Sequence, residues 1–367
     1  MKLIWLKFGC LLLLGLLAAG CGPLVKKESP PADLPSSPNH PTASSSPVTE
    51  NFVTPSGKKP QFVVLAFDGS HSLDMWQKTL DFSQQMSAQG TKVKFTYFLS
   101  GVYFLNYRKA HRYVPPDGQP GHSLIGFADS NKDVEKRVAF VNRAIAEGHE
   151  IGSHLNGHFD GTHWSQQQWQ VEFNAFNNLV FSIPQNNDVS AKDAARYTLN
   201  LTAKQLVGLR APELGSNPAM FKVLKEQGYT YDTSLNGKAN AWPEKLDNGI
   251  WEFPLAQINY ATTTKKILSM DYNFYYKQSN AKDVAVKGTP VWNAFYNDTY
   301  NSYLNYFSAN YNANRAPVYI GSHFSEWNDG VYWEAMRDFA AEVCGKPEVY
   351  CVTFGELEQY MESQPVN

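Results

Sequence analysis

The stretch that most restricts the fold of this chain is an uninterrupted apolar run, FVVLAF, at residues 62–67. A strand with no polar side chain on either face is buried on both sides, as in parallel sheets that helices cover. The next residues carry helix signals, because Ser72 can cap a helix whose apolar stripe ends before Gly90. Residues 93–100, VKFTYFLS, then form the next predicted strand. This succession predicts an α/β fold with a parallel sheet.

The same alternation continues to the C-terminus. Apolar stripes at helical spacing predict further helices over residues 134–148, 217–228 and 332–343. Strand-like segments lie between them, at residues 150–154, 205–212, 229–234, 250–255, 267–272, 317–324 and 351–354. About eight strands in one continuous series favour a closed or nearly closed barrel over an open sheet.

Residues 1–21 have the layout of a signal peptide. Lys2 and Lys7 precede an apolar run, CLLLLGLLAAG, that is shorter than a membrane-spanning helix requires. The ending LAAGC resembles a bacterial lipobox, which implies that Cys21 becomes the lipid-modified first residue of the mature protein. An ordinary cleaved signal peptide is the alternative. We therefore expect an exported lipoprotein anchored to a membrane, at the outer membrane or cell surface if the cell has two membranes.

Residues 22–60 are dense in Pro and Ser and poor in large apolar side chains, which predicts a disordered tether. Residues 61–367 then form the folded domain. Two cysteines lie there, Cys344 and Cys351, and they either form a short disulfide loop or stay as two reduced, buried thiols. The formal net charge of −2, with no basic patch, argues against nucleic acid as a partner.

Polar residues follow several of the predicted strands at the point where each strand ends. They are Asp68, His154, Arg210, Asp232 and His323. In a barrel of parallel strands these ends meet on one face, where active sites lie. Each residue alone has an ordinary structural use, such as a helix cap, a surface ion pair or a hydrogen-bonded core position. Together they bring carboxylates, a cation and imidazoles to one face.

The first of these histidines, His154, has a neighbour four residues on, His158, in GHEIGSHLNGH. Neutral imidazoles are good ligands for Zn²⁺ and similar ions. A zinc-peptidase motif would need Glu at the position of Leu155 and a regular helix, which Gly157 would weaken. With the other strand-end residues, the pair therefore predicts a metal site that is not of the peptidase kind.

The order of these residues is similar to that of the polysaccharide deacetylase family, the NodB-homology proteins of carbohydrate esterase family 4. AFDG resembles the first family motif, SHLNGH the second, LRAP the third, YDTS with WEFPL the fourth, and SHFSEW the last, across most of residues 61–360. The resemblance implies a distorted (β/α) barrel of about seven to eight parallel strands. It also implies a metal-dependent hydrolase, a polysaccharide (N-acetylglucosamine) deacetylase, that removes N-acetyl groups from the amino sugars of a cell-wall or extracellular polysaccharide.

The resemblance further implies a role for each matched residue. A divalent metal, usually zinc, would be held by His154 and His158 with a carboxylate. Asp68 would be the general base, and the backbone N–H of Glu213 would help to stabilise the oxyanion. His323 would protonate the departing amine.

Three further residues enter through the same resemblance. Arg210 would pair with Asp68 and keep it ionised. Asp232 is one candidate for orienting His323, and Asp271 in SMDYN competes for that role.

The first motif departs from the family, which has two adjacent aspartates, the first as base and the second as metal ligand. Here Gly69 follows Asp68, so one carboxylate is missing. Asp68 can remain the base, with a third ligand from His71, Asp74, Asp160 or water. Alternatively, Asp68 ligates the metal and another group acts as base. The first alternative is favoured, because Asp68 directly follows Phe67 as the base does in the family.

The missing carboxylate also supports a second interpretation, a deacetylase-like barrel without catalysis that acts as a glycan-binding lipoprotein. The retained histidines and Arg210 favour the enzyme. Glu213 stands where the family usually has an aromatic residue, which affects the expected specificity rather than the chemistry. Four tryptophans could stack on sugar rings, although core packing is their commoner use: Trp164, Trp242, Trp251 and Trp327.

Overall fold

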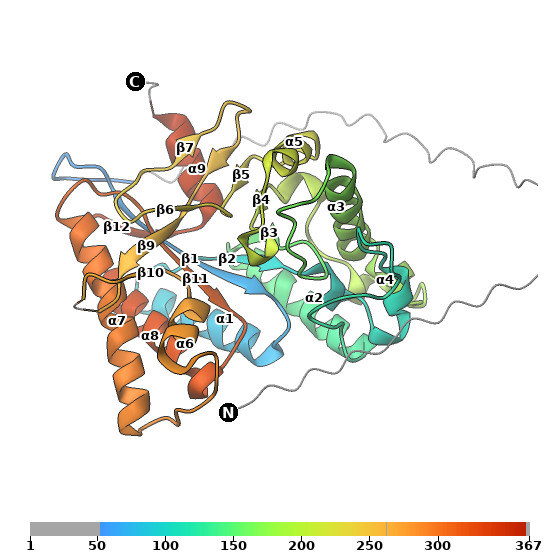
Figure 1. Ribbon diagram of the computed structural model, residues 1–367, viewed down its shortest axis with the longest axis horizontal. Helices are drawn as coiled ribbons and strands as arrows, with labels where there is room; N and C mark the ends of the chain where they lie inside the picture. The colour runs from blue at the N-terminus through green and yellow to red at the C-terminus, as the bar shows by residue number, and fades with distance from the viewer. Residues whose placement is uncertain (1–51, 262, 365–367) are drawn as a thin grey trace, which may run out of the picture. The chain divides into compact units, whose positions relative to one another are not determined.

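The computed structural model describes residues 52–261 and 263–364, and within these ranges strands and helices alternate as the sequence predicts. The larger of two sheets has nine strands (Figure 1). Their order is β11 (Val318–His323), β1 (Gln61–Gly69), β2 (Phe95–Leu99), β3 (Glu150–Ser153), β4 (Gly208–Leu209), β5 (Tyr231–Asp232), β8 (Trp251–Glu252) and β7 (Glu244–Lys245), with β12 (Val349–Val352) paired to β1. Every pairing is parallel except that of β7 with β8. This curled, mostly parallel sheet confirms the predicted distorted barrel.

A second, smaller sheet forms part of the barrel wall. Its three strands are β10 (Lys266–Leu268), β9 (Leu255–Asn259) and β6 (Asn236–Lys238), in that order. A bridge between Met270 and Gly321 joins the segment after β10 to β11. The barrel is therefore distorted relative to a regular (β/α) barrel, because its wall is made of two sheets rather than one continuous sheet.

The apolar run of β1 is buried on both faces because its side chains alternate between two hydrophobic clusters. The odd-numbered residues pack with α1 (Leu73–Ala88) in the cluster between sheet and helices. The even-numbered residues pack inside the barrel, where Phe98 and Phe354 lie. Asp68 continues the even-numbered series, so its carboxylate lies on the inner side of the strand at the C-terminal end.

Helices surround the sheet (Figure 1). The α-helices after α1 are α2 (Asn131–Ala146), α3 (Gln166–Phe181), α4 (Ile183–Asn186), α5 (Pro218–Glu226), α6 (Asp271–Ser279), α7 (Pro290–Tyr311), α8 (Trp327–Val343) and α9 (Phe354–Ser363). Short 3₁₀ helices lie at Gly101–Phe104, Tyr107–Arg112, Ala194–Tyr197, Ala203–Gln205 and Pro212–Leu214. Most of the α-helices pack in the outer cluster, whereas α9 supplies Phe354 and Leu357 to the inner cluster.

The sequence patterns do not predict α3, α6 or α7, and one predicted strand is partly wrong. Residues 267–272 were expected as a strand, but β10 ends at Leu268 and α6 begins at Asp271. An acidic side chain in the first turn favours a helix N-terminus, and Asp271 accepts a hydrogen bond from the N–H of Tyr272 at 2.7 Å. The polypeptide therefore changes from strand to helix within this segment.

Phe52 and Val53, near the end of the predicted tether, contact the domain. The ring of Phe52 lies edge-on to the rings of Phe62, at 4.9 Å, and Tyr350, at 5.0 Å between centroids. The Tyr350 hydroxyl donates a hydrogen bond to the Val53 carbonyl at 2.6 Å. The packed part of the chain therefore includes residues before 61. Cys21, with the predicted signal peptide and most of the tether, lies outside the described residues.

A disulfide joins Cys344, just after α8, to Cys351 in β12, which is the first of the two alternatives that the sequence left open. Among the helices of the described residues, none has the length and apolar character that crossing a bilayer requires.

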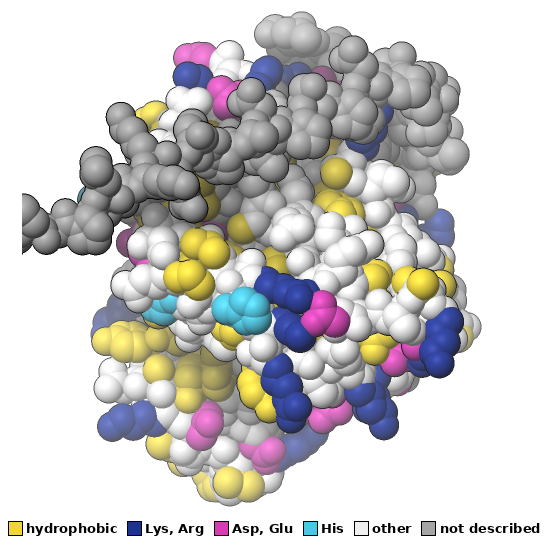
Figure 2. All heavy atoms as spheres, turned by 90° about the vertical axis from the view of Figure 1, so that its right-hand side faces the viewer, with side chains coloured by type: hydrophobic (Ala, Val, Ile, Leu, Met, Phe, Trp, Pro, Cys, Tyr) yellow, Lys and Arg dark blue, Asp and Glu magenta, His cyan; other side chains and the backbone are white. Residues whose placement is uncertain are grey.

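The surface near α4 carries both signs of charge. Lys109 and Arg112 both pair with Asp188 there. On the face seen in Figure 2, basic side chains are interleaved with acidic and hydrophobic ones rather than gathered in one broad patch. This distribution agrees with the near-balanced composition.

The packing of Phe52 generates a test of where the domain begins. We expect Phe52→Ala to lower the free energy of unfolding by about 1–2 kcal/mol, less than truncation of a fully buried ring because Phe52 is partly exposed. Chemical denaturation of the full chain would measure this. Val53→Ala is the control, since its side chain is 63% exposed; equal stability of both variants and the wild type would contradict the packing.

Candidate active site

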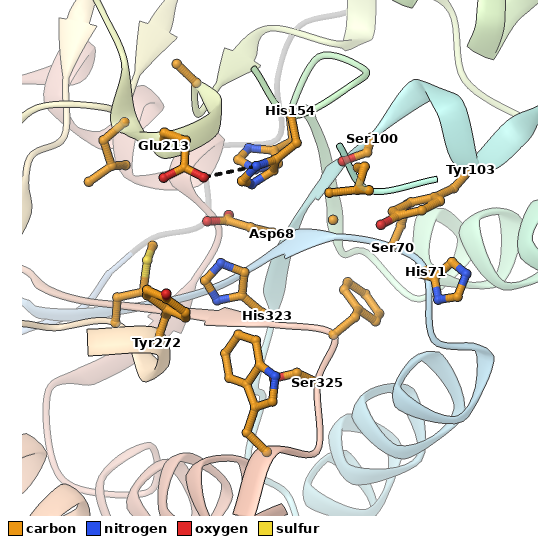
Figure 3. Close-up of a pocket in the computed structure, with 18 of the residues that line it drawn as sticks. Asp68, Ser70, His71, Ser100, Tyr103, His154, Glu213, Tyr272, His323 and Ser325 are labelled. Atoms are coloured by element: carbon orange, nitrogen blue, oxygen red, sulfur yellow. Dashed lines mark ion pairs between the residues drawn. The ribbon is translucent and has the colours of Figure 1, made fainter. Parts of the chain in front are cut away.

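Side chains at the C-terminal ends of β11, β1, β2 and β3, and others from the segments after β4 and β10, line one pocket of about 540 Å³ (Figure 3). Five of the residues with a predicted role in the chemistry lie in its wall: Asp68, His154, His158, Glu213 and His323. They lie on the face of the barrel where the strand ends meet, as the resemblance implied. The sequence pattern therefore places these five residues together.

Asp68 forms a buried ion pair with Arg210, whose Nη1 donates to Asp68 Oδ1 at 2.9 Å. The guanidinium also donates to the Thr233 hydroxyl at 3.2 Å, and it lies over the rings of Phe98 and Phe354. Burial alone would raise the pKa of Asp68, but the charge and the hydrogen bond of Arg210, together with the neighbouring His154 and His323, outweigh burial and hold this pKa below its usual value. Asp68 is therefore an ionised carboxylate that can accept a proton.

His154 presents a lone pair to the pocket. Its Nδ1 lies 2.7 Å from the Arg210 carbonyl oxygen, and since a carbonyl can only accept, this nitrogen carries the proton. The other ring nitrogen, Nε2, is buried and has no hydrogen-bond partner among the described residues. Burial lowers the pKa of His154 to about 3, so the ring is neutral. A neutral imidazole with this tautomer fixed can bind a metal ion or accept a proton.

His158 lies beside His154, with ring centroids 5.3 Å apart. Its Nδ1 is 3.3 Å from Glu213 Oε1, the ion pair drawn as a dashed line in Figure 3. Burial lowers the pKa of His158, although the charge of Glu213 opposes that shift. Two imidazoles and one carboxylate therefore gather at one side of the pocket.

Glu172, in the unpredicted helix α3, supports the loop that carries both histidines. Its buried carboxylate accepts from the N–H of Asn156 at 3.1 Å and from the hydroxyl of Tyr113 at 2.9 Å. That hydroxyl accepts in turn from the N–H of Gly157 at 3.2 Å. The loop needs such support because two of its residues, Leu155 and His158, have positive φ angles of 51° and 62°. The sequence feature that could have indicated this role is the single Glu among the aromatic residues of the segment that forms α3.

The carboxylate that contacts His323 is Asp271. Asp271 Oδ1 lies 2.6 Å from His323 Nδ1, and Oδ2 accepts from the His323 N–H at 2.8 Å. Burial alone would lower the pKa of His323, but the charge and the hydrogen bond of Asp271, together with the charge of Asp68, outweigh burial and raise this pKa above its usual value. Asp232, named first for this role, instead accepts two hydrogen bonds from Ser234, whose hydroxyl accepts from the N–H of Ala211. Asp232 thus supports the segment after Arg210.

The other residues that the sequence offered as a third metal ligand make different contacts. His71 lines the pocket opposite Glu213 and packs on Tyr103, at 4.8 Å between ring centroids (Figure 3). Asp74 is exposed in the first turn of α1. Asp160 accepts two hydrogen bonds from Thr162.

Within the described residues, no group of three or more His, Cys, Asp and Glu side chains converges closely enough to hold a metal ion as it stands. The donor set at the histidine pair nevertheless suits one. His154 has a buried nitrogen without a partner, His158 lies beside it, and a carboxylate contacts His158. Two imidazoles and a carboxylate oxygen are a frequent ligand set of catalytic zinc.

An aromatic rim borders His323. Tyr272, at the start of α6, is 44% exposed, and its ring lies 5.6 Å from that of Trp327. Trp327 is 5.3 Å from His323 and stacks on Tyr275 at 4.8 Å, with an interplanar angle of 6°. Trp327 is the one tryptophan of the predicted four that lines the described pocket.

Comparison with solved structures gives the fold. A solved structure from Mycobacterium smegmatis, named as that of a polysaccharide deacetylase, aligns with 86% of this chain over 94% of its own length. The TM-score is 0.51 and the sequence identity is 14%. The fold is that of the polysaccharide deacetylases. At 14% identity the likeness concerns the fold alone.

Two further structures have lower scores. The chitin deacetylase of Colletotrichum lindemuthianum aligns over 81% of this chain and 87% of its own, with a TM-score of 0.44 and 16% identity. A family 4 carbohydrate esterase pseudoenzyme of Bacillus anthracis aligns over 81% of this chain and 65% of its own, with a TM-score of 0.41 and 9% identity. No protein-family model matches the sequence, and no curated protein matches it.

The contact between Asp271 and His323 generates a test of the protonation of the site. We expect Asp271→Asn to lower the pKa of His323, because the carboxylate that favours the imidazolium is replaced by a neutral amide. Titration of the histidine ring signals by NMR would measure this shift. Asp117→Asn is the matched control, because Asp117 lies 2.6 Å from a different histidine, His122, on the surface; this variant should leave the pKa of His323 unchanged. An unchanged His323 pKa in Asp271→Asn would refute the assignment.

Proposed function

We propose that this chain is a metal-dependent hydrolase that removes N-acetyl groups from the amino sugars of a polysaccharide. The observation that carries the proposal is the ionised Asp68, paired with Arg210, in one pocket with His154, His158 and His323. Metal-assisted hydrolysis of an acetamide uses a base for the water, ligands for the metal and an acid for the leaving nitrogen. Asp68, the pair of His154 and His158, and His323 can supply these three functions from one cavity.

His154 and His158 are the residues that would hold the metal, with zinc the ion that this type of ligand most often binds. When bound there, the ion would polarise the acetyl carbonyl and lower the pKa of water. The tautomer of His154 is already set for this role by the Arg210 carbonyl.

The protein's own side chains would move the protons. Asp68 would accept a proton from the attacking water, since Arg210 keeps its carboxylate ionised. Attack would form a C–O bond to the acetyl carbon. When the resulting tetrahedral intermediate collapses, the C–N bond would break, and His323, held by Asp271, would donate its proton to the leaving nitrogen. The products would be acetate and an amino sugar. The backbone N–H of Glu213, in the pocket wall, is the proposed donor to the oxyanion.

The aromatic rim supports a sugar as the substrate. Tyr272 and Trp327 border the pocket beside His323, and an exposed ring can stack on the apolar face of a pyranose. A substrate with an acetamide group but no sugar ring could not stack on these side chains. The rim therefore favours an acetylated glycan over a small acylated amine.

A second candidate function is glycan binding without catalysis. The observation in its favour is Gly69, which leaves the first motif with one carboxylate where the family has two. The same pocket and aromatic rim would then hold a polysaccharide without hydrolysing it.

Acetate release by the full chain from N-acetylglucosamine oligomers tests the enzyme. We expect Asp68→Asn and His323→Gln each to lower kcat by at least about a hundredfold, because each removes a proton-transfer group. Asp117→Asn, which changes a surface carboxylate, should leave kcat unchanged. Full activity in Asp68→Asn would end the proposed mechanism. Binding of the oligomers by a wild-type chain that releases no acetate would favour the second candidate.

We also propose that the chain is exported and anchored to a membrane through lipid on Cys21. The support is the sequence LAAGC that ends the predicted signal peptide. Cys21→Ser should move the protein from the membrane fraction to the soluble fraction of the producing cells, or leave it with its signal peptide uncleaved. Fractionation with immunodetection, and the mass of the mature protein, would measure this. An unmodified Cys21 in the wild type would reject the anchor.

A further inference from the structure

Glu213 has an unusual backbone conformation at the edge of the pocket. Both Glu213 and Leu214 have φ angles of 56°, in the left-handed region that ordinary residues avoid. Two such residues in succession are strained, and strain of this kind clusters at functional sites. The segment follows Arg210 by only three residues, so it is attached to a rigid, buried anchor.

The side chain of Glu213 reaches into the pocket rather than out to solvent alone. Its Oε1 lies 3.3 Å from His158 Nδ1, an ion pair that Figure 3 marks with a dashed line, and the figure shows the carboxylate on the side of the pocket where His154 lies. The side chain keeps 59% of its surface exposed. No other hydrogen-bond or ion-pair partner of this carboxylate is present among residues 52–261 and 263–364. Glu213 is therefore a carboxylate with spare acceptor capacity beside two imidazoles.

A second observation indicates that a ligand belongs at this place. His154 is 3% exposed, and its Nε2 is buried, unprotonated and without a partner among the described residues. A buried acceptor that is left unsatisfied costs free energy, so such atoms need an explanation. The ring lines the same cavity as His158 and Glu213. A cation bound among the three side chains would supply the missing partner.

Asp68 is less suited to be the third ligand. Its Oδ1 already accepts from Arg210, and the two charges balance each other in a buried pair. If Asp68 also ligated a metal, the pocket would lack its ionised base. Gly69 has no side chain to offer, and its φ angle of 98° disfavours any residue that has one.

We propose that Glu213 supplies the carboxylate of a metal site formed by His154, His158 and Glu213, in place of the carboxylate that position 69 lacks. This inference rests on the proposed function, because it names the third ligand of the same site. It leaves Asp68 free to act as the base. It also explains why an acidic residue stands where an aromatic one is usual.

Zinc binding by the full chain tests this assignment without any measurement of activity. The protein, freed of metal with a chelator and dialysed, would be titrated with Zn²⁺ in competition with a chromogenic chelator. We expect one ion per chain, and Glu213→Gln to weaken binding by at least about tenfold, since loss of a ligand costs no less than loss of its supporting partner. The visible spectrum of the Co²⁺ form should change in the same variant.

Matched variants separate the outcomes. Glu213→Asp, which keeps a carboxylate, should bind Zn²⁺ more tightly than Glu213→Gln, and Glu244→Gln, an exposed change in β7, should match the wild type. Because the Glu213 side chain is mostly exposed, its substitution should leave the circular dichroism spectrum unchanged. His154→Ala should abolish binding.

Three results would overturn the inference. Unchanged Zn²⁺ affinity in Glu213→Gln would reject Glu213 and leave the metal-dependent hydrolase standing. Weakened binding in Asp68→Asn, with Glu213→Gln unaffected, would make Asp68 the ligand. A wild-type chain that binds no Zn²⁺ would reject the inference and the proposed function together.

Discussion

The buried ion pair between Asp68 and Arg210 is the interaction on which the site depends. Removing two charges from water costs several kcal/mol per ion unless the pair is well aligned and its other polar groups are satisfied. Arg210 meets this condition through Thr233 and two aromatic rings. Its carbonyl also fixes the tautomer of His154, and Glu213 follows it closely in the chain. One residue thus ties together the base, an imidazole and the nearby carboxylate.

Much of this arrangement could be predicted from local patterns. The fully apolar run of β1 required burial on both faces, and therefore a helix-covered sheet of parallel strands. Parallel strands bring their C-terminal ends to one face, so Asp68, His154 and His323 had to meet near one another. The position at which each strand ends can be read from the sequence. In a fold of repeated strand–helix units, residues at these positions lie close together in space.

The parts that could not be predicted depend on contacts between distant segments. Asp271 and Glu172 lie on α6 and α3, helices without a clear apolar stripe in the sequence. The longest helix, α7, is rich in Asn, Ser, Thr and Tyr, which are weak helix formers, and it buries Thr299 and Asn310. Such helices are stabilised by packing against neighbours, as α7 is by α8, rather than by their own periodicity. Asp232 and Asp271 both lie near the end of strand-like segments in the sequence, so sequence position alone could not decide between them.

The conformation of Gly69 has a consequence for any redesign of this site. A β-carbon at position 69 would meet no atom within 4 Å, so space does not exclude a larger residue there. The backbone does, because a φ angle of 98° is unfavourable for every residue with a side chain. The substitution Gly69→Asp alone would therefore not give the site a second, unstrained carboxylate beside Asp68, since the peptide would also have to rotate. A carboxylate at this position needs a change of backbone conformation as well as a change of residue, whereas the carboxylate of Glu213 is already present in the pocket wall.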